Sequence, residues 1–67
     1  MTTPTVGTGT QSIDRAADLL ARVVRAPSPV TFTELAEVTG LARSTTSRLL
    51  SALERADLLA RDEQARW

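Results

Sequence analysis

Residues 31–56, which read TFTELAEVTGLARSTTSRLLSALERA, contain two predicted helices separated by a very short turn. The first helix begins at Thr31, because a Thr followed three residues later by Glu34 is typical of a capping box. Gly40 stands where a helix often ends in a left-handed residue. Only two residues then intervene before helical periodicity resumes, which favours a tight turn between two crossing helices. The apolar positions of this short helix are Leu35, Ala36 and Val38.

The helix predicted over residues 43–56 has two contrasting faces. Its inward face is expected to contain Thr46, Leu49, Leu50 and Leu53. Its opposite face is small, cationic and rich in hydrogen-bond donors, and it consists of Arg43, Ser44, Ser47, Arg48, Ser51 and Arg55. Glu54 is the only acidic residue of this helix, and Arg55 beside it is expected to be solvated or ion-paired and not to contact bases.

Such a face suits the major groove of DNA, which admits one α-helix and needs short polar residues together with long donors. The amides at the start of the helix would add a site for a phosphate. The predicted DNA-binding residues are Arg43, Ser44, Thr45, Ser47, Arg48 and Ser51. A face of Arg and Ser is also what a merely solvated helix presents, so that alternative stays open at this point.

Residues 12–25 predict an earlier amphipathic helix, with Ser12 as its N-cap and Pro27 just beyond its end. Asp18 and Arg22 are spaced for an ion pair on it. Leu19 lies at the edge of the apolar arc of this helix, and it is expected either to pack at the margin of the core or to take part in a subunit contact. The positions expected to face the core are Ile13, Ala16, Ala17, Leu20, Val23 and Val24.

The remaining segments complete a mainly α fold, a three-helix winged helix-turn-helix domain over residues 12–67. Residues 58–61 predict a strand, residues 62–64 a turn and residues 65–67 a returning strand, so that a two-stranded wing is cut short at Trp67. Residues 1–11 are rich in Thr and Gly and predict a flexible arm without a signal peptide or membrane anchor. We therefore expect a cytoplasmic protein that does not contact a membrane.

Composition restricts the possible functions. The chain has 67 residues and neither Cys nor His, so we expect no metal, no cofactor and no catalytic residues, and the chain is predicted not to be an enzyme. A net charge of zero argues mildly against nucleic-acid binding, although all eight basic residues are Arg. A domain this small is marginally stable alone, which favours either a partner chain, expected to be a second copy in a homodimer, or a missing second domain.

Residues 32–59 resemble the winged helix-turn-helix of IclR-type transcriptional regulators, and the resemblance extends over residues 12–67. The matching positions are Ser12, Asp14, Arg15, Ala16, Glu34, Leu35, Ala36, Thr39, Gly40, Leu41, Ser44, Thr45, Arg48, Leu49, Leu50 and Leu53. The chain departs from the family pattern at Ala42, often Pro, at Thr46, often aliphatic, and at Asp57, often Gly. The Thr46 hydroxyl can bond a carbonyl one turn back, and Asp tolerates a left-handed backbone.

The resemblance implies sequence-specific binding to double-stranded DNA and regulation of transcription. It also implies a C-terminal effector-binding domain, which has no counterpart in this chain. An alternative is the winged-helix dimerisation module of a small-molecule methyltransferase, whose Glu-Leu-Ala and Arg-Leu-Leu pattern is similar. In that module the third helix packs against protein and need not be polar.

Overall fold

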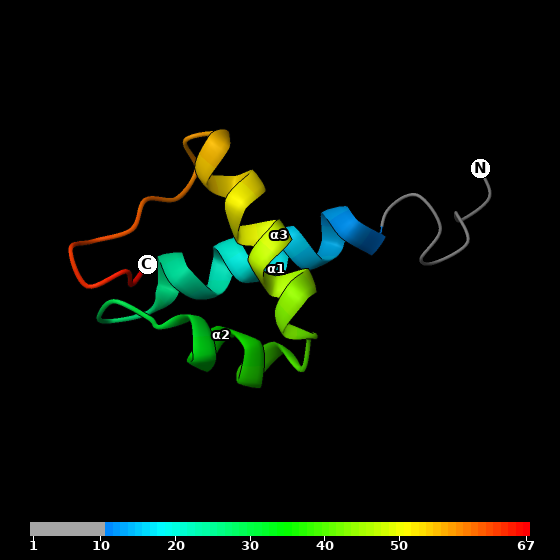
Figure 1. Cartoon of the computed structure of the whole chain (residues 1–67), viewed down its shortest axis with the longest axis horizontal. Coiled ribbons are helices and arrows are strands. Elements are labelled where there is room, and N and C mark those ends of the chain that lie inside the picture. The colour runs from blue at the N-terminus through cyan, green and yellow to red at the C-terminus, as the bar shows by residue number, and fades with distance from the viewer. Residues whose placement is uncertain (1–10) are drawn as a thin grey trace.

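The computed structural model describes residues 11–67, in which three helices pack around one core. They are α1 (Gln11–Arg25), α2 (Phe32–Thr39) and α3 (Arg43–Arg55). Each helix contacts both of the others, and α3 crosses over α1 while α2 lies to one side (Figure 1). This confirms the mainly helical, three-helix expectation. Most of the predicted arm, residues 1–10, lies outside the described residues, and Gln11 belongs to α1.

The ends of α2 form as its sequence predicts. The Glu34 amide donates to the Thr31 hydroxyl over 3.1 Å, and the Thr31 amide donates to the Glu34 carboxylate over 2.9 Å. These two bonds are the reciprocal pair of a capping box. Gly40 closes the helix with a φ of 72°, and its amide donates to the Ala36 carbonyl over 3.0 Å. The turn into α3 is therefore fixed by local hydrogen bonding.

The expectation that Ser12 is the N-cap of α1 was wrong. An N-cap needs an extended backbone so that its side chain can turn back to the first free amides. Ser12 lies inside α1, which already includes Gln11, so it is not the cap. The ion pair expected further along this helix is present, with 3.1 Å between Arg22 Nε and Asp18 Oδ2.

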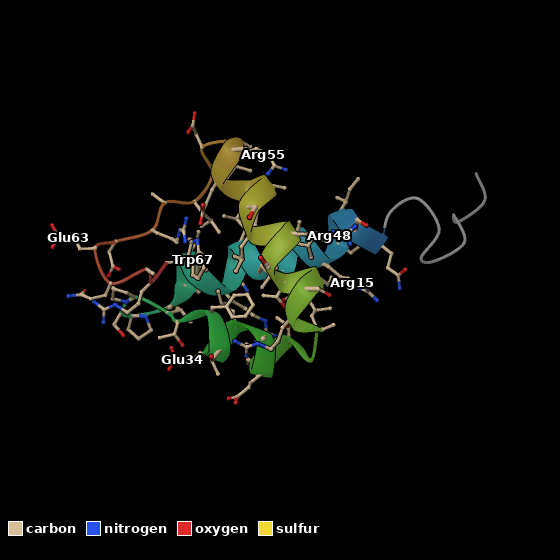
Figure 2. The ribbon with its side chains drawn as sticks, viewed as in Figure 1. Arg15, Glu34, Arg48, Arg55, Glu63 and Trp67 are labelled. Carbon is tan, nitrogen blue, oxygen red and sulfur yellow. The ribbon has the colours of Figure 1, made fainter. Side chains whose placement is uncertain are left out.

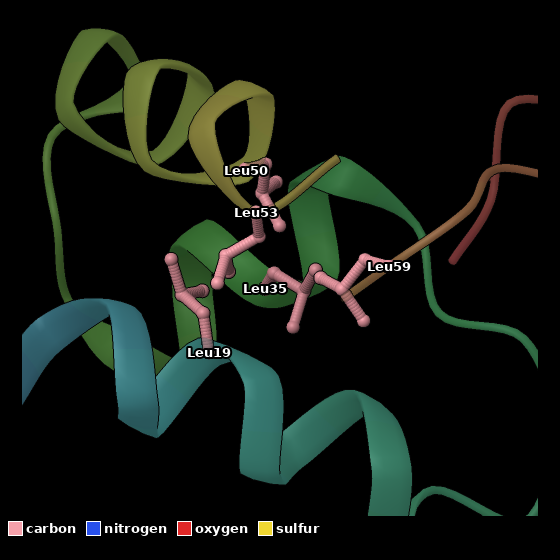
Figure 3. Close-up of a cluster of buried hydrophobic side chains, with 5 residues drawn as sticks. All are labelled: Leu19, Leu35, Leu50, Leu53 and Leu59. Carbon is pink, nitrogen blue, oxygen red and sulfur yellow. The ribbon is translucent and has the colours of Figure 1, made fainter. Parts of the chain in front are cut away.

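Five leucines form the centre of the core, one or two from each helix and one from the segment after α3 (Figure 3). They are Leu19, Leu35, Leu50, Leu53 and Leu59. Leu19 is completely buried, so its expected place at the margin of the α1 apolar arc was wrong. The reason is that α1 packs against both other helices, which turns Leu19 to the middle of its covered face.

Four apolar residues expected in the core are exposed instead. Ile13 is 66% exposed and Val24 is 70% exposed, both on α1, and Val38 of α2 is 55% exposed. Ala17 is exposed as well. The apolar arc of α1 is thus wider than the surface that α2 and α3 cover, a surplus that periodicity alone does not reveal.

The expected two-stranded wing is not shown, because none of residues 11–67 forms a strand. The first two residues of the segment 58–61 are hydrogen-bonded to α3, since the amides of Leu58 and Leu59 both donate to the Leu53 carbonyl. Asp57 before them has a φ of 61°, the left-handed backbone expected there. α3 also ends at Arg55, one residue earlier than expected.

The end of the described chain pairs with a different segment. The chain turns at residues 62–66, where the Asp62 amide donates to the Arg66 carbonyl over 2.8 Å. Val30 and Trp67 then exchange two backbone hydrogen bonds of 2.6 and 2.8 Å, as an antiparallel pair does. Figure 1 accordingly shows the C-terminus beside the connection between α1 and α2.

Candidate nucleic-acid interface

The predicted DNA-binding residues lie together on the outer face of α3. Five of these side chains are exposed, and Thr45 is half-buried: the exposed ones are Arg43, Ser44, Ser47, Arg48 and Ser51. The opposite face of the helix is buried through Thr46, Leu50 and Leu53. α3 therefore points hydroxyl and guanidinium groups toward solvent (Figure 2), because its leucines are fixed in the core.

The side chain of Arg43 is held by an aromatic ring that the sequence analysis did not assign to the site. Its guanidinium carbon lies 4.7 Å from the ring centre of Phe32. A guanidinium over an aromatic face is attracted by the negative electrostatic potential of the ring face, and its hydrogen-bond donors stay free at the edge. Phe32 thus restricts where Arg43 can point.

The first turn of α3 has no side-chain cap. Its N-cap is Ala42, which has no side-chain acceptor for the first amides. The Thr46 hydroxyl donates to the Ala42 carbonyl over 3.0 Å, which is the bond expected for a buried Thr at that position, and this bond does not cap the amides. Unbonded amides at a helix start carry partial positive charge and suit an anion.

Glu54 connects the far end of α3 to the C-terminal segment. Its Oε2 atom accepts a hydrogen bond from Trp67 Nε1 over 2.6 Å and lies 3.1 Å from Arg61 Nε. Arg61 in turn lies over the Trp67 ring, 5.8 Å from its centre. α3 turns Glu54 toward this segment and leaves Arg55 exposed, which agrees with the expectation that Arg55 is solvated.

A hollow of about 230 Å³ lies between α3 and the C-terminal segment. Its lining includes Ser47 and Ser51 of the outer face, together with Phe32, Glu54, Arg61 and Trp67. The C-terminal segment is therefore a direct neighbour of the predicted DNA-binding face. Beside it, the turn at residues 62–66 is closed by Asp62, whose pKa is lowered below the ordinary 3.8, chiefly by the hydrogen bond from the Arg66 amide.

No helix within residues 11–67 is long and apolar enough to cross a membrane. Within the same residues, no three acidic side chains gather where they could hold a metal ion.

Two helices joined by a tight turn, the second with an exposed face of Arg and Ser, define the helix-turn-helix class of DNA-binding domains. Comparison with known families agrees and is more specific. The chain belongs to the family of the IclR helix-turn-helix domain, whose family model matches residues 12–63. The resemblance seen in the sequence is therefore confirmed.

A curated relative supports the same assignment. Over 52 residues, 78% of this chain, the sequence is 46% identical to the HTH-type transcriptional regulator Rv1719 of Mycobacterium tuberculosis (strain ATCC 25618 / H37Rv). The match covers 20% of the length of that regulator, so this chain corresponds to about a fifth of it. No solved structure matches the chain significantly.

Proposed function

We propose that this chain binds double-stranded DNA in a sequence-specific way as a homodimer, with α3 in the major groove, and thereby regulates transcription. The observation that supports this most directly is the outer face of α3. Its Arg and Ser side chains are exposed while the same helix is fixed by buried leucines on its other side. A rigid helix with short polar residues and long donors fits the width and the hydrogen-bonding edges of the major groove.

Arg48 and Arg43 have different roles in this proposal. Arg48 lies in the middle of the outer face and is the candidate for a bidentate contact to a base edge. Arg43 lies at the uncapped start of α3, held over Phe32, and is the candidate for a phosphate contact. The hydroxyl groups of Ser44, Ser47 and Ser51 complete the surface at close range.

The C-terminal segment is the second proposed contact. The C-terminal segment contains the turn at residues 62–66, and it is held to α3 by Glu54 and to Val30 by the Val30–Trp67 pair. We infer that it follows the DNA backbone beside the groove that α3 enters.

The family match favours DNA binding over the alternative, the dimerisation module of a methyltransferase. That module would bury the outer face of α3 against protein, whereas this face is exposed here.

The proposal is tested by selecting duplexes from a random library with the purified chain at about 50 mM salt, where phosphate contacts are stronger than at physiological salt. We expect a two-fold motif with half-sites about one helical turn apart or a multiple of it. Failure to enrich any sequence would contradict sequence-specific binding.

Substitutions then separate the two roles. Arg48→Ala should weaken binding to the selected site by about 1–3 kcal/mol and leave random DNA almost unaffected. Arg43→Ala should weaken binding to every duplex and lower the slope of log K against log salt by about one. Arg55→Ala is the matched control at the far end of the same helix, and it should change neither quantity. Equal losses for all three variants would contradict the assigned roles.

A further inference from the structure

The first residue of α2 and the first residue of α3 meet at the edge of the candidate interface. They are Phe32 and Arg43, and the guanidinium carbon of Arg43 lies 4.7 Å from the centre of the Phe32 ring. Phe32 is half-buried and packs against the leucine core, so its ring has a fixed position. Arg43 is exposed, and a long side chain of this kind loses rotamer freedom when it is ordered. The ring therefore gives a rigid support to a side chain that would otherwise move freely.

The position of Arg43 is unfavourable for α3 as an isolated helix. Its positive charge stands at the start of the helix, where the helix dipole favours a negative charge, and the first turn of α3 has no acidic residue. The N-cap residue Ala42 supplies no side-chain acceptor for the first amides. Local rules that are broken together are typical of a functional site. The start of α3 is therefore better suited to an anion from outside the helix than to helix stability.

An aromatic ring and a carboxylate would hold Arg43 with different consequences. A carboxylate would neutralise the guanidinium and occupy its donors, as Asp18 does for Arg22. The Phe32 ring attracts the guanidinium through its face and leaves the N–H groups at the edge free. Arg43 forms no ion pair within residues 11–67. The contact with Phe32 therefore orders Arg43 and leaves its charge and its donors for a phosphate.

We propose that Phe32 is a positioning residue for DNA binding, which holds Arg43 in place at the start of α3 before a DNA phosphate arrives. This inference rests on the proposed function only in taking the anion to be a DNA phosphate, and it does not require sequence specificity. A cation–π contact at an exposed site raises the population of the ordered side chain by about twofold to fivefold. Affinity for DNA rises by up to the same factor for each Arg43, because less of the bound population has to be ordered on binding.

A double-mutant cycle on a random-sequence duplex at about 50 mM salt tests the proposal. Phe32→Leu keeps an apolar side chain against the core and removes the ring, so it should weaken DNA binding by about twofold to fivefold for each Arg43 engaged. In an Arg43→Ala background the same change should have no effect, because no guanidinium is left to position. A loss as large in that background as in the native chain would overturn the proposal, since it would show a structural role for Phe32 alone.

Two further readouts separate positioning from a structural role. Phe32→Leu should leave the slope of log K against log salt unchanged, because Arg43 still reaches the phosphate, whereas Arg43→Ala lowers that slope by about one. A lower slope for Phe32→Leu would show that the ring holds Arg43 only within the complex and not before it, which contradicts the proposal. Phe32→Tyr keeps the ring and should bind DNA within about twofold of the native chain. Equal losses for the Leu and Tyr variants would overturn the proposal as well.

NMR of the chain without DNA separates this inference from the proposed function. The Phe32 ring should shift the side-chain protons of Arg43 upfield of those of Arg48, which lies over no ring within residues 11–67. Phe32→Leu should remove that shift. Arg43 protons at the same positions as those of Arg48 in the native chain would overturn the inference, whatever the DNA titrations give.

The DNA results then divide between the two proposals. If the native chain selects no sequence, the proposed function fails, and the cycle on random-sequence DNA still decides the role of Phe32. If the selected site binds the native chain and Phe32→Leu equally tightly, the inference is overturned and the function stands. A chain that binds no duplex at all would refute both.

Discussion

Glu54→Gln should change stability and DNA affinity in opposite directions. The carboxylate accepts the Trp67 indole N–H over 2.6 Å and pairs with Arg61 over 3.1 Å. The amide keeps one acceptor oxygen and loses the charge. Weakening a hydrogen bond to a charged acceptor costs about 0.5–1.5 kcal/mol, and a partly exposed ion pair contributes about 0.2–1 kcal/mol. We therefore expect a loss of about 1–2 kcal/mol, or roughly 5–15 °C in Tm for a domain of this size.

The effect on DNA binding should have the reverse sign. Glu54 shares a hollow with Ser47 and Ser51, so its negative charge lies close to the face that would meet phosphates. At about 10 Å in water, one such charge repels a phosphate by about 0.4 kcal/mol, which is close to twofold in affinity. Releasing Arg61 also frees a cation for the backbone, which should steepen the salt slope by about 0.9.

Thermal unfolding and a salt series of DNA titrations measure both effects on one preparation. The control is the same substitution in an Arg61→Ala background, where Glu54→Gln should no longer steepen the salt slope. A variant that unfolds at the native Tm would show that Glu54 does not hold the C-terminal segment. An affinity that falls together with stability would show that Glu54 supports the DNA-binding face instead of opposing it.

Three smaller predictions concern the scaffold. Thr46→Val should leave the free energy of unfolding in urea unchanged or raise it by up to about 1 kcal/mol. The backbone amide of residue 46 still donates to the Ala42 carbonyl, and a methyl group replaces a buried hydroxyl. A loss of stability above about 1 kcal/mol would contradict this. Gly40→Ala should cost about 1–2 kcal/mol in the same assay, because its φ is 72° and the space around it is open, so strain is the only cost; an unchanged midpoint would refute that reasoning. The pKa of Asp62 is lowered, so its contribution to the turn is complete above the unfolded value and is lost as pH falls through the lower folded value. An NMR titration of the Arg66 amide should show a midpoint below 3.8 that disappears in Asp62→Asn, and a midpoint at or above 3.8 would be inconsistent with the hydrogen bonds.

The sequence predicted α2 and its turn well because their determinants are local. A capping box spans four residues and a left-handed Gly acts on its own helix end, so both follow from neighbouring residues. The position of Leu19 depended on where α2 and α3 pack, which periodicity within α1 does not contain. The same limit explains why Ile13 and Val24 were expected in the core.

Two features of the candidate site had only weak sequence signals. Phe32 was the only Phe of the chain and adjoined the capping box, yet its contact with Arg43 depends on the crossing of α2 and α3. The partners of Glu54 come from a segment that returns to α3 by pairing with Val30, a contact 37 residues apart in the chain. Long-range pairing of this kind replaced the local hairpin expected over residues 58–67.

The distribution of charge in the structure removes the objection that a net charge of zero raises against DNA binding. Four of the eight acidic residues are engaged by other groups of the chain, and they are Asp18, Glu34, Glu54 and Asp62. The arginines of α3 form no ion pair within residues 11–67, and they are Arg43, Arg48 and Arg55. Glu54, the only acidic residue of α3, is paired with Arg61, which lies outside that helix. Because screening limits charge interactions to about 10 Å at 0.1 M salt, a phosphate near α3 responds to this local excess of positive charge and hardly to the total for the chain.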